Sequence, residues 1–241
     1  MLMRHTGFII IFLLLVAVSS CSEQPAPKAP PKAQTEGERV QARVDSLKEA
    51  AEEGDLIVRL GDDMLSYSIR FLSQKDPSFS HTGIVVVKEG KKLVCHIYPD
   101  EAGADTIRYD PIDSFANPAR NLQCGLYRYE LSEIEQRTFL ADMAGYQKQR
   151  VRFDRLYDLK SDDKVYCSEM IAKSLLRSTS GRIMIEQSKV PKKMLPLMSS
   201  YFKNENISKK QLSEDRYIAI DDLYLHPKCR QIMRINLQPS S

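Results

Sequence analysis

Histidine and cysteine are scarce in this sequence of 241 residues, which contains four of the first and five of the second. Neither is spaced as in a zinc site, because no CxxC and no HxxxH pattern occurs. Basic and acidic residues nearly balance, at a net charge of +3, and no basic stripe is interleaved with aromatic residues. We therefore expect no metal, no other cofactor and no nucleic acid as a partner.

Long apolar runs are also absent, with the N-terminus as the exception. There Arg4 precedes the apolar residues 7–18, a run shorter than the roughly 20 residues that a membrane helix needs. A basic start, an apolar middle and the small residues Ser19 and Ser20 are typical of a secretory signal peptide. We expect residues 1–20 to be that signal.

Cys21 follows the small residues directly, an arrangement that resembles the lipobox of bacterial lipoproteins. The resemblance implies that Cys21 is lipidated and becomes the mature N-terminus, which anchors the protein without a transmembrane helix. Ser22, rather than an aspartate, comes next, and this implies an outer-membrane anchor facing the periplasm of the cell envelope. An ordinary secretory signal with a coincidental cysteine is the alternative.

Residues 24–37 are rich in proline, alanine and lysine and lack apolar periodicity, as in an extended tether. We therefore divide the mature chain into a lipidated cysteine with its tether, residues 21–38, and one domain, residues 39–241. That length suits a single domain with its own core.

Apolar periodicity predicts both helices and strands in this domain. Helices are expected over residues 40–53 and 62–74, from Ser132 to about Gln149 after a capping box, and from Cys167 onward. Strands are expected over residues 54–58, 82–88, 92–98, 121–129, 217–220 and 231–237, with a turn at Gly90. Strands clustered in the middle with helices on either side are typical of an α+β fold.

The chemistry of this domain centres on Cys167 at a helix start and His81 at the start of a buried strand. The unpaired N–H groups of a helix N-terminus stabilise an oxyanion, and with a nearby imidazole they are expected to lower the pKa of the thiol. His96 lies on the next strand, where the hairpin brings it close to His81. Cys167 as nucleophile, His81 as base and His96 as the residue that orients the base would form a complete site.

These residues also have ordinary structural explanations. A lone cysteine in an apolar helix is most often a small buried hydrophobe. Cys95, Cys124, Cys167 and Cys229 are an even number in an oxidising compartment, where disulfides form. A nucleophilic Cys167 has to stay free, which leaves at most one disulfide among the other three, of open pairing.

The order of four short motifs resembles that of the permuted papain-like amidases, the YiiX/YaeF group. They are GDLIV at residues 54–58, SHTGI at 80–84, His96, and YCSE at 166–169. In the related NlpC-type cell-wall peptidases the cysteine helix comes first, whereas here it comes last. The likeness covers about residues 50–180. It implies a circularly permuted papain-like, NlpC-like α+β fold, with an antiparallel sheet packed against helices and the catalytic cysteine at a helix N-terminus.

The same resemblance implies roles for individual residues. It makes Cys167 the nucleophile, His81 the base and His96 the third polar position. Tyr166 and Glu169 are expected near the oxyanion or in the pocket. Plain packing is the alternative for Tyr166, and a structural polar contact near the site is the alternative for Glu169. Asp55 is expected to be structural, because a carboxylate at the turn into a strand bonds local N–H groups.

These features predict a monomeric cell-envelope cysteine hydrolase that cleaves an amide, or an ester, by acyl transfer. Two substrate classes stay open: a peptidoglycan stem peptide, by analogy with the unpermuted relatives, and an acylated amino acid or lipid-like amide. The sequence contains no wall-binding repeat module, which weakens the first. The alternative is a non-catalytic envelope lipoprotein that uses the same fold to bind a ligand.

Overall fold

A computed structural model describes residues 34–99, 105–157, 159–201 and 209–238, which belong to one compact unit that begins at Gln34. The expected signal peptide, Cys21 and most of the tether lie outside the described residues. Across the described part of the chain, no helix has both the length and the apolar character that crossing a membrane requires.

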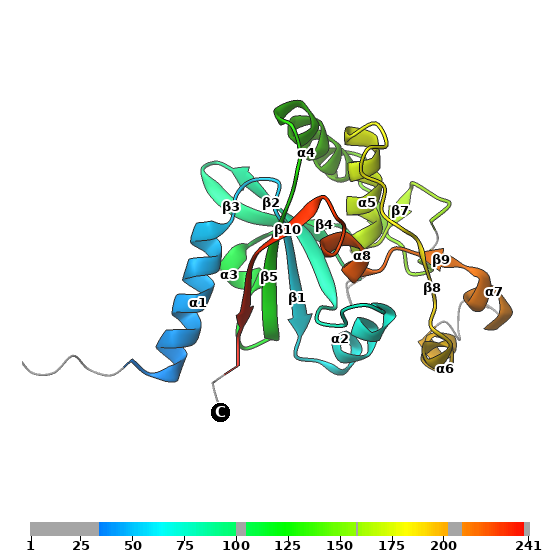
Figure 1. Ribbon diagram of the computed structural model, residues 1–241, viewed down its shortest axis with the longest axis horizontal. Helices are drawn as coiled ribbons and strands as arrows, with labels where there is room; N and C mark the ends of the chain where they lie inside the picture. Colours follow the sequence, from blue (N-terminus) through cyan, green and yellow to red (C-terminus); the bar gives the residue numbers. More distant parts are fainter. Residues whose placement is uncertain (1–33, 100–104, 158, 202–208, 239–241) are drawn as a thin grey trace, which may run out of the picture. The chain divides into compact units, whose positions relative to one another are not determined.

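Six antiparallel strands form the central sheet in the order β10-β5-β1-β2-β3-β4 (Figure 1). Their bounds are Leu56–Gly61 for β1, His81–Lys88 for β2, Lys91–Ile97 for β3, Ile107–Pro111 for β4, Asn121–Tyr129 for β5 and Cys229–Asn236 for β10. The β2–β3 hairpin turns at Glu89 and Gly90, whose φ values are 52° and 71°. Positive φ at both positions matches the twist of the flanking strands, so the hairpin holds its register.

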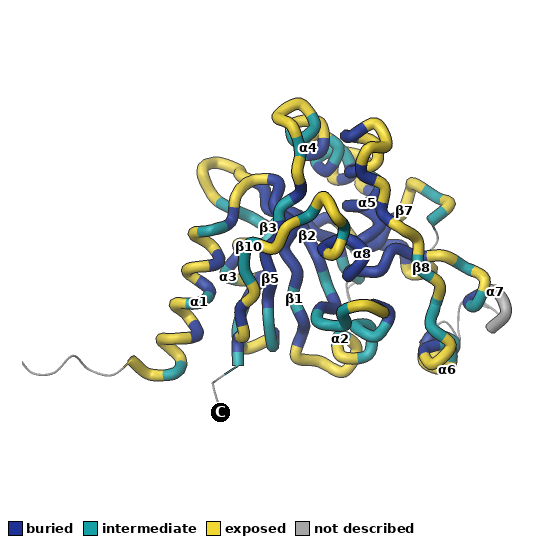
Figure 2. Tube along the Cα trace, viewed as in Figure 1, coloured by how far each residue is buried: buried dark blue, intermediate teal, exposed yellow. Residues whose placement is uncertain are grey.

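Helices cover both faces of this sheet. Helices α1 (Glu36–Ala50) and α3 (Ile112–Phe115) cover one face, and α4 (Glu133–Lys148), α5 (Cys167–Ser178) and α8 (Ile220–Tyr224) cover the other. Side chains alternate along a strand, so Leu56 and Val58 pack with the second group of helices and Ile57 with the first. The inner strands β1, β2 and β5 are therefore largely buried, as the dark central trace in Figure 2 shows.

Shorter elements surround the end of the sheet where β1 ends and β2 begins. Helix α2 (Met64–Ile69) continues as a 3-10 turn at Arg70–Leu72. The remaining described elements are the parallel pair β6 (Arg152–Phe153) and β7 (Lys164–Val165), the antiparallel pair β8 (Ser188–Lys189) and β9 (Arg216–Tyr217), the 3-10 turn Lys192–Met194, α6 (Leu195–Tyr201) and α7 (Lys209–Glu214).

The predicted α+β class is confirmed, and the strand over residues 121–129 has its predicted bounds. The strand predicted over residues 217–220 is wrong, because pairing stops at Tyr217 and α8 begins at Ile220. The α-helix predicted over 62–74 is too long at both ends, and α1 begins earlier than predicted, after a capping box at Thr35. Strand β4 was not predicted, because an edge strand with half-buried polar residues lacks the apolar run of its neighbours.

Candidate active site

Cys167 is the first residue of α5, directly after Tyr166, whose extended backbone forms the helix cap. The thiol lies against the backbone of β2, where the N–H of Thr82 and the N–H groups of Ser168 and Cys167 itself stabilise negative charge on the sulfur. The first N–H groups of a helix have no partner within it. The start of α5 therefore places the Cys167 N–H next to the thiol, in a position where it can donate to an oxyanion.

Two histidines and a carboxylate form a hydrogen-bonded chain across three neighbouring strands. His81 Nε2 lies 2.9 Å from His96 Nδ1, and His96 Nε2 lies 3.1 Å from the Asp110 Oδ2. The pKa of Asp110 is lowered, chiefly by the hydrogen bond from His96, so this carboxylate is an acceptor.

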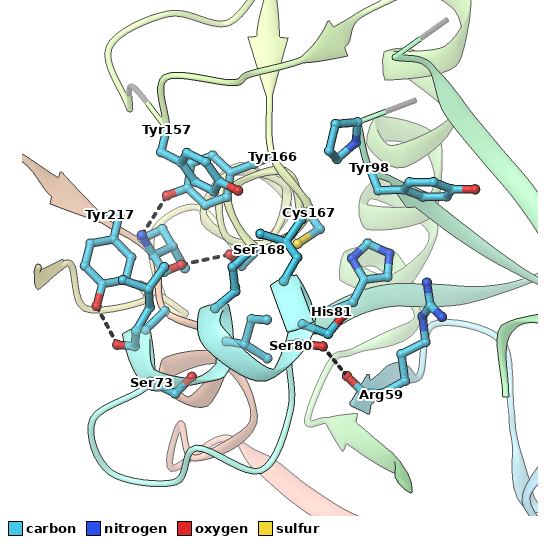
Figure 3. A pocket seen from close by; sticks show the side chains of 18 of the residues that line it. Arg59, Ser73, Ser80, His81, Tyr98, Tyr157, Tyr166, Cys167, Ser168 and Tyr217 are labelled. Carbon is cyan, nitrogen blue, oxygen red and sulfur yellow. Dashed lines mark hydrogen bonds between the residues drawn. The ribbon is translucent and has the colours of Figure 1, made fainter. Parts of the chain in front are cut away.

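The direction of each hydrogen bond in this chain follows from the ionised Asp110. His96 donates its Nε2–H to Asp110, and its Nδ1 then accepts a hydrogen bond from the Nε2–H of His81. These roles are assigned from the hydrogen-bond network. They leave Nδ1 of His81 as its free basic nitrogen. The sulfur of Cys167 points toward the His81 ring (Figure 3).

The site at rest holds an uncharged thiol and an uncharged imidazole. Burial raises the pKa of the Cys167 thiol to about 11, and outweighs the nearby N–H groups. Burial also lowers the pKa of His81 well below its usual range, with the positive charge of Arg59 as the second cause. The expected lowering of the thiol pKa by the helix start is therefore wrong, because burial outweighs it. Attack by an uncharged thiol would require transfer of its proton to His81 in the same step.

A cavity of about 380 Å³ opens beside the thiol (Figure 3). Its polar wall includes His81 and Arg59, and its walls elsewhere are mainly apolar. The aliphatic and aromatic lining consists of Leu65, Ile69, Leu72, Tyr98, Pro99, Phe153, Tyr157, Tyr166, Tyr217, Ile218, Ala219 and Ile220. A second cavity of about 240 Å³ shares Leu65, Ile69 and Tyr157 with the first and extends toward α6. The thiol therefore faces an apolar space that continues beyond the site itself.

Tyr166 and Glu169 occupy different places. Tyr166 lines the cavity, and its hydroxyl accepts a hydrogen bond of 2.7 Å from the N–H of Ile218. Glu169 is fully buried, accepts a hydrogen bond from the Tyr166 N–H at 3.2 Å and lies 2.9 Å from Lys173 Nζ. It is not among the residues that line the cavity. The structure thus brings Tyr166 to the site and places Glu169 behind it.

Asp55 and the other cysteines lie away from the cavity. Asp55 accepts two hydrogen bonds from Arg128, of 2.6 and 2.8 Å, and a third from the Glu52 N–H. Cys95, Cys124 and Cys229 are free thiols, as is Cys167. Cys21 lies outside the described residues.

Two residues of the site were not predicted from the sequence. Asp110 lies on the edge strand β4, which its own pattern did not reveal. Arg59 stands in β1 directly opposite His81, and a single charged residue at a strand end carries no signal of its own. The register of β1 with β2 would have found it.

Comparison with known proteins identifies a matching family and a similar solved structure. Residues 50–215 match the family model described as permuted papain-like amidase enzyme, YaeF/YiiX. The crystal structure of the metalloprotein yiiX from Escherichia coli O157:H7 superimposes with a TM-score of 0.62 at 21% identity, over 77% of this chain and 98% of that one. A search of curated proteins gives no match.

The donor set of this chain does not fit a resident metal at the site. His81 Nε2 and both ring nitrogens of His96 are engaged in the hydrogen-bonded chain to Asp110, which leaves fewer free donors than a tetrahedral site needs. Within the described ranges, no three His, Cys, Asp or Glu side chains converge as metal ligands.

Proposed function

The chain belongs to the permuted papain-like amidase family, and from this membership we propose that it is a cysteine hydrolase that cleaves an amide or ester bond of an acylated substrate. One observation carries the proposal. The Cys167 thiol and the free nitrogen of His81 share one cavity, and His96 and Asp110 hold the His81 ring in the tautomer of a base.

The reaction follows from these positions. Cys167 Sγ attacks the carbonyl carbon while its proton passes to Nδ1 of His81, and the Cys167 N–H binds the oxygen that becomes negative. The imidazolium then protonates the leaving amine or alcohol, the bond to the carbonyl carbon breaks, and a thioester on Cys167 remains. Water, deprotonated by His81, releases the acid and restores the thiol.

The cavity favours an apolar acyl group over a peptidoglycan peptide. A peptide needs polar partners along its backbone, whereas most of the wall away from His81 is aliphatic and aromatic, with Asp63, Ser66, Ser73 and Ser168 as its polar side chains. The adjoining cavity adds Met64, Leu197 and Met198, which extend the apolar surface. An acyl chain fits this lining because its burial needs no hydrogen bonds.

We further propose that this hydrolase works at a membrane. The N-terminal residues support a signal peptide over 1–20, a lipidated Cys21 and a tether to about residue 38. An outer-membrane anchor facing the periplasm would bring the cavity to lipid-like amides or esters. A monomer suffices, because the described residues of one chain supply the whole proposed site.

The test is hydrolysis by the full chain of amides with acyl groups of increasing length, followed by mass spectrometry. We expect the rate to rise with acyl length, Cys167→Ala to abolish it, and Cys229→Ala, which removes a half-buried thiol away from the cavity, to leave it unchanged. Acyl compounds that bind without turnover would identify a non-catalytic binding module instead. Turnover of purified peptidoglycan with none of the acyl amides would overturn the proposed substrate class.

A further inference from the structure

Arg59 brings a positive charge to the cavity beside the proposed base. It lies on β1 in direct register with His81 on β2, and residues paired in this way have neighbouring side chains. Both residues line the cavity of Cys167, and Figure 3 shows Arg59 on the same side of the thiol as His81.

The guanidinium of Arg59 is largely without partners. Of its five N–H donors, Nη1 donates to Asn121 Oδ1 at 2.9 Å, while Nε is shielded from solvent and has no hydrogen-bond partner. The face of the Phe115 ring lies 5.0 Å away. Burial lowers the pKa of Arg59, which reflects the loss of hydration around a charge that an arginine nevertheless keeps.

Carboxylates near Arg59 are engaged elsewhere. Asp63 lines the same cavity, but its side chain caps α2 by accepting a hydrogen bond from the Ser66 N–H at 2.8 Å. Asp110 accepts from His96. None of the ion pairs among the described residues includes Arg59. A shielded cation with open donors is costly unless a ligand completes it.

We propose that Arg59 is an anion subsite of the Cys167 cavity and that the substrate carries a carboxylate or phosphate on its leaving group. The proposed reaction determines which part of the substrate lies beside Arg59, and to that extent the inference rests on the proposed function. His81 gives its proton to the leaving group, so the leaving group lies on the side of His81 and Arg59. The apolar walls at Tyr157 and Tyr217 then hold the acyl chain.

Alkylation of Cys167 tests the subsite without any turnover. Iodoacetate and iodoacetamide react with the same thiol, but only iodoacetate is negatively charged. The rate with iodoacetate divided by the rate with iodoacetamide is therefore independent of any change in thiol reactivity. In the full chain, mapped to the Cys167 peptide, we expect this ratio to exceed that of free cysteine. In Arg59→Gln it should fall by at least about tenfold, the effect of one charge-assisted hydrogen bond, while Arg59→Lys and the surface variant Lys91→Gln keep a high ratio.

Each result decides the proposal. A ratio in the unmodified protein no higher than that of free cysteine would overturn it, and this measurement does not depend on whether a variant folds. An equal ratio in the unmodified protein and folded Arg59→Gln would also overturn it. If the ratio falls but no acyl amide is hydrolysed, the subsite stands and the proposed function fails.

Hydrolysis identifies which anion Arg59 binds. The compounds are dodecanoyl amides of glycine, of phosphoethanolamine and of ethanolamine, which carry a carboxylate, a phosphate and no charge. We expect the anionic amide that fits to be cleaved at least about tenfold faster than the neutral one, and Arg59→Gln to remove that preference. Equal cleavage of all three amides would contradict the subsite.

Discussion

At the scale of single residues, the direction of each hydrogen bond defines the candidate site. Asp110 is ionised and accepts from His96, His96 accepts from His81, and one nitrogen of His81 is left to receive the thiol proton. His96 lies on β3, next to β2, and Asp110 on β4 beyond it. Asp110 does not line the cavity, so we regard it as a positioning residue that acts through His96.

Removing Asp110 should therefore change turnover and leave binding nearly intact. In Asp110→Ala the Nε2–H of His96 loses its acceptor, and the tautomer of His81 is no longer fixed. We expect kcat to fall by at least about tenfold with little change in KM.

The pH profile separates this role from a structural one. Burial lowers the pKa of His96, and the hydrogen bond and negative charge of Asp110 oppose this lowering. Loss of Asp110 should therefore lower the pKa further and move the acid limb of kcat/KM to lower pH. Asp113→Ala, which removes a half-exposed carboxylate paired with Lys48, is the control. A profile that only scales down, with its limb unmoved, would contradict the positioning role of Asp110.

At the scale of elements, the starts of α5 and α4 share one contact and differ in their electrostatics. Glu169 accepts a hydrogen bond from the Tyr166 N–H at the start of α5, and Glu135 accepts one from the Ser132 N–H at the start of α4. Burial raises the pKa of Glu169 to about 7 from an ordinary value of 4.5, whereas the hydrogen bond from Arg182 lowers that of Glu135 to about 2. Stability should therefore depend on pH in opposite directions at these two helix starts.

The sign for each follows from proton binding. Between 4.5 and about 7 the folded chain binds a proton at Glu169 that the unfolded chain does not, so this stabilisation is complete below 4.5 and is lost as pH rises through about 7. Glu135 stabilises above 4.5, and its contribution is lost as pH falls toward about 2.

Urea unfolding at about pH 5 and about pH 8 measures the difference for Glu169. Relative to Glu169→Gln, which keeps an acceptor for the Tyr166 N–H, the unmodified protein should lose stability between the two pH values. Glu135→Gln should instead be the less stable chain at about pH 8. A free-energy difference for Glu169→Gln that stays constant with pH would show that its carboxyl does not titrate as expected.

Helices and strands were predictable from the sequence where burial imposes a regular spacing of apolar residues. Residues 121–129 in the middle of the sheet and the helix from Cys167 follow their apolar spacing. Residues 217–220 are apolar because they line the cavity and the core, so apolarity there does not indicate a strand. The edge strand β4 is polar and half-buried, so the strand was not predicted. Asp110, which lies on it, was therefore not predicted as a site residue.

At the scale of the whole molecule, the order of the motifs indicated the family more strongly than any single motif. The strand at residues 54–58, the histidine strands and the cysteine helix are far apart in sequence, and family membership followed from their order. The sheet brings His81 and His96 together across one hairpin, and α5 lies against β2. What the sequence could not reveal is what depends on three-dimensional neighbours: the unpaired donors of Arg59, the apolar cavity and the raised thiol pKa.

In the proposed reaction Cys167 carries the acyl group during turnover. The most direct measurement is peptide-mapped mass spectrometry of the full chain after brief reaction with an activated dodecanoyl ester. We expect a dodecanoyl thioester on Cys167, absent from Cys229 and absent when His81 is replaced in His81→Ala. An acyl group found on Cys229 instead, or equal acylation of Cys167 in His81→Ala, would contradict it.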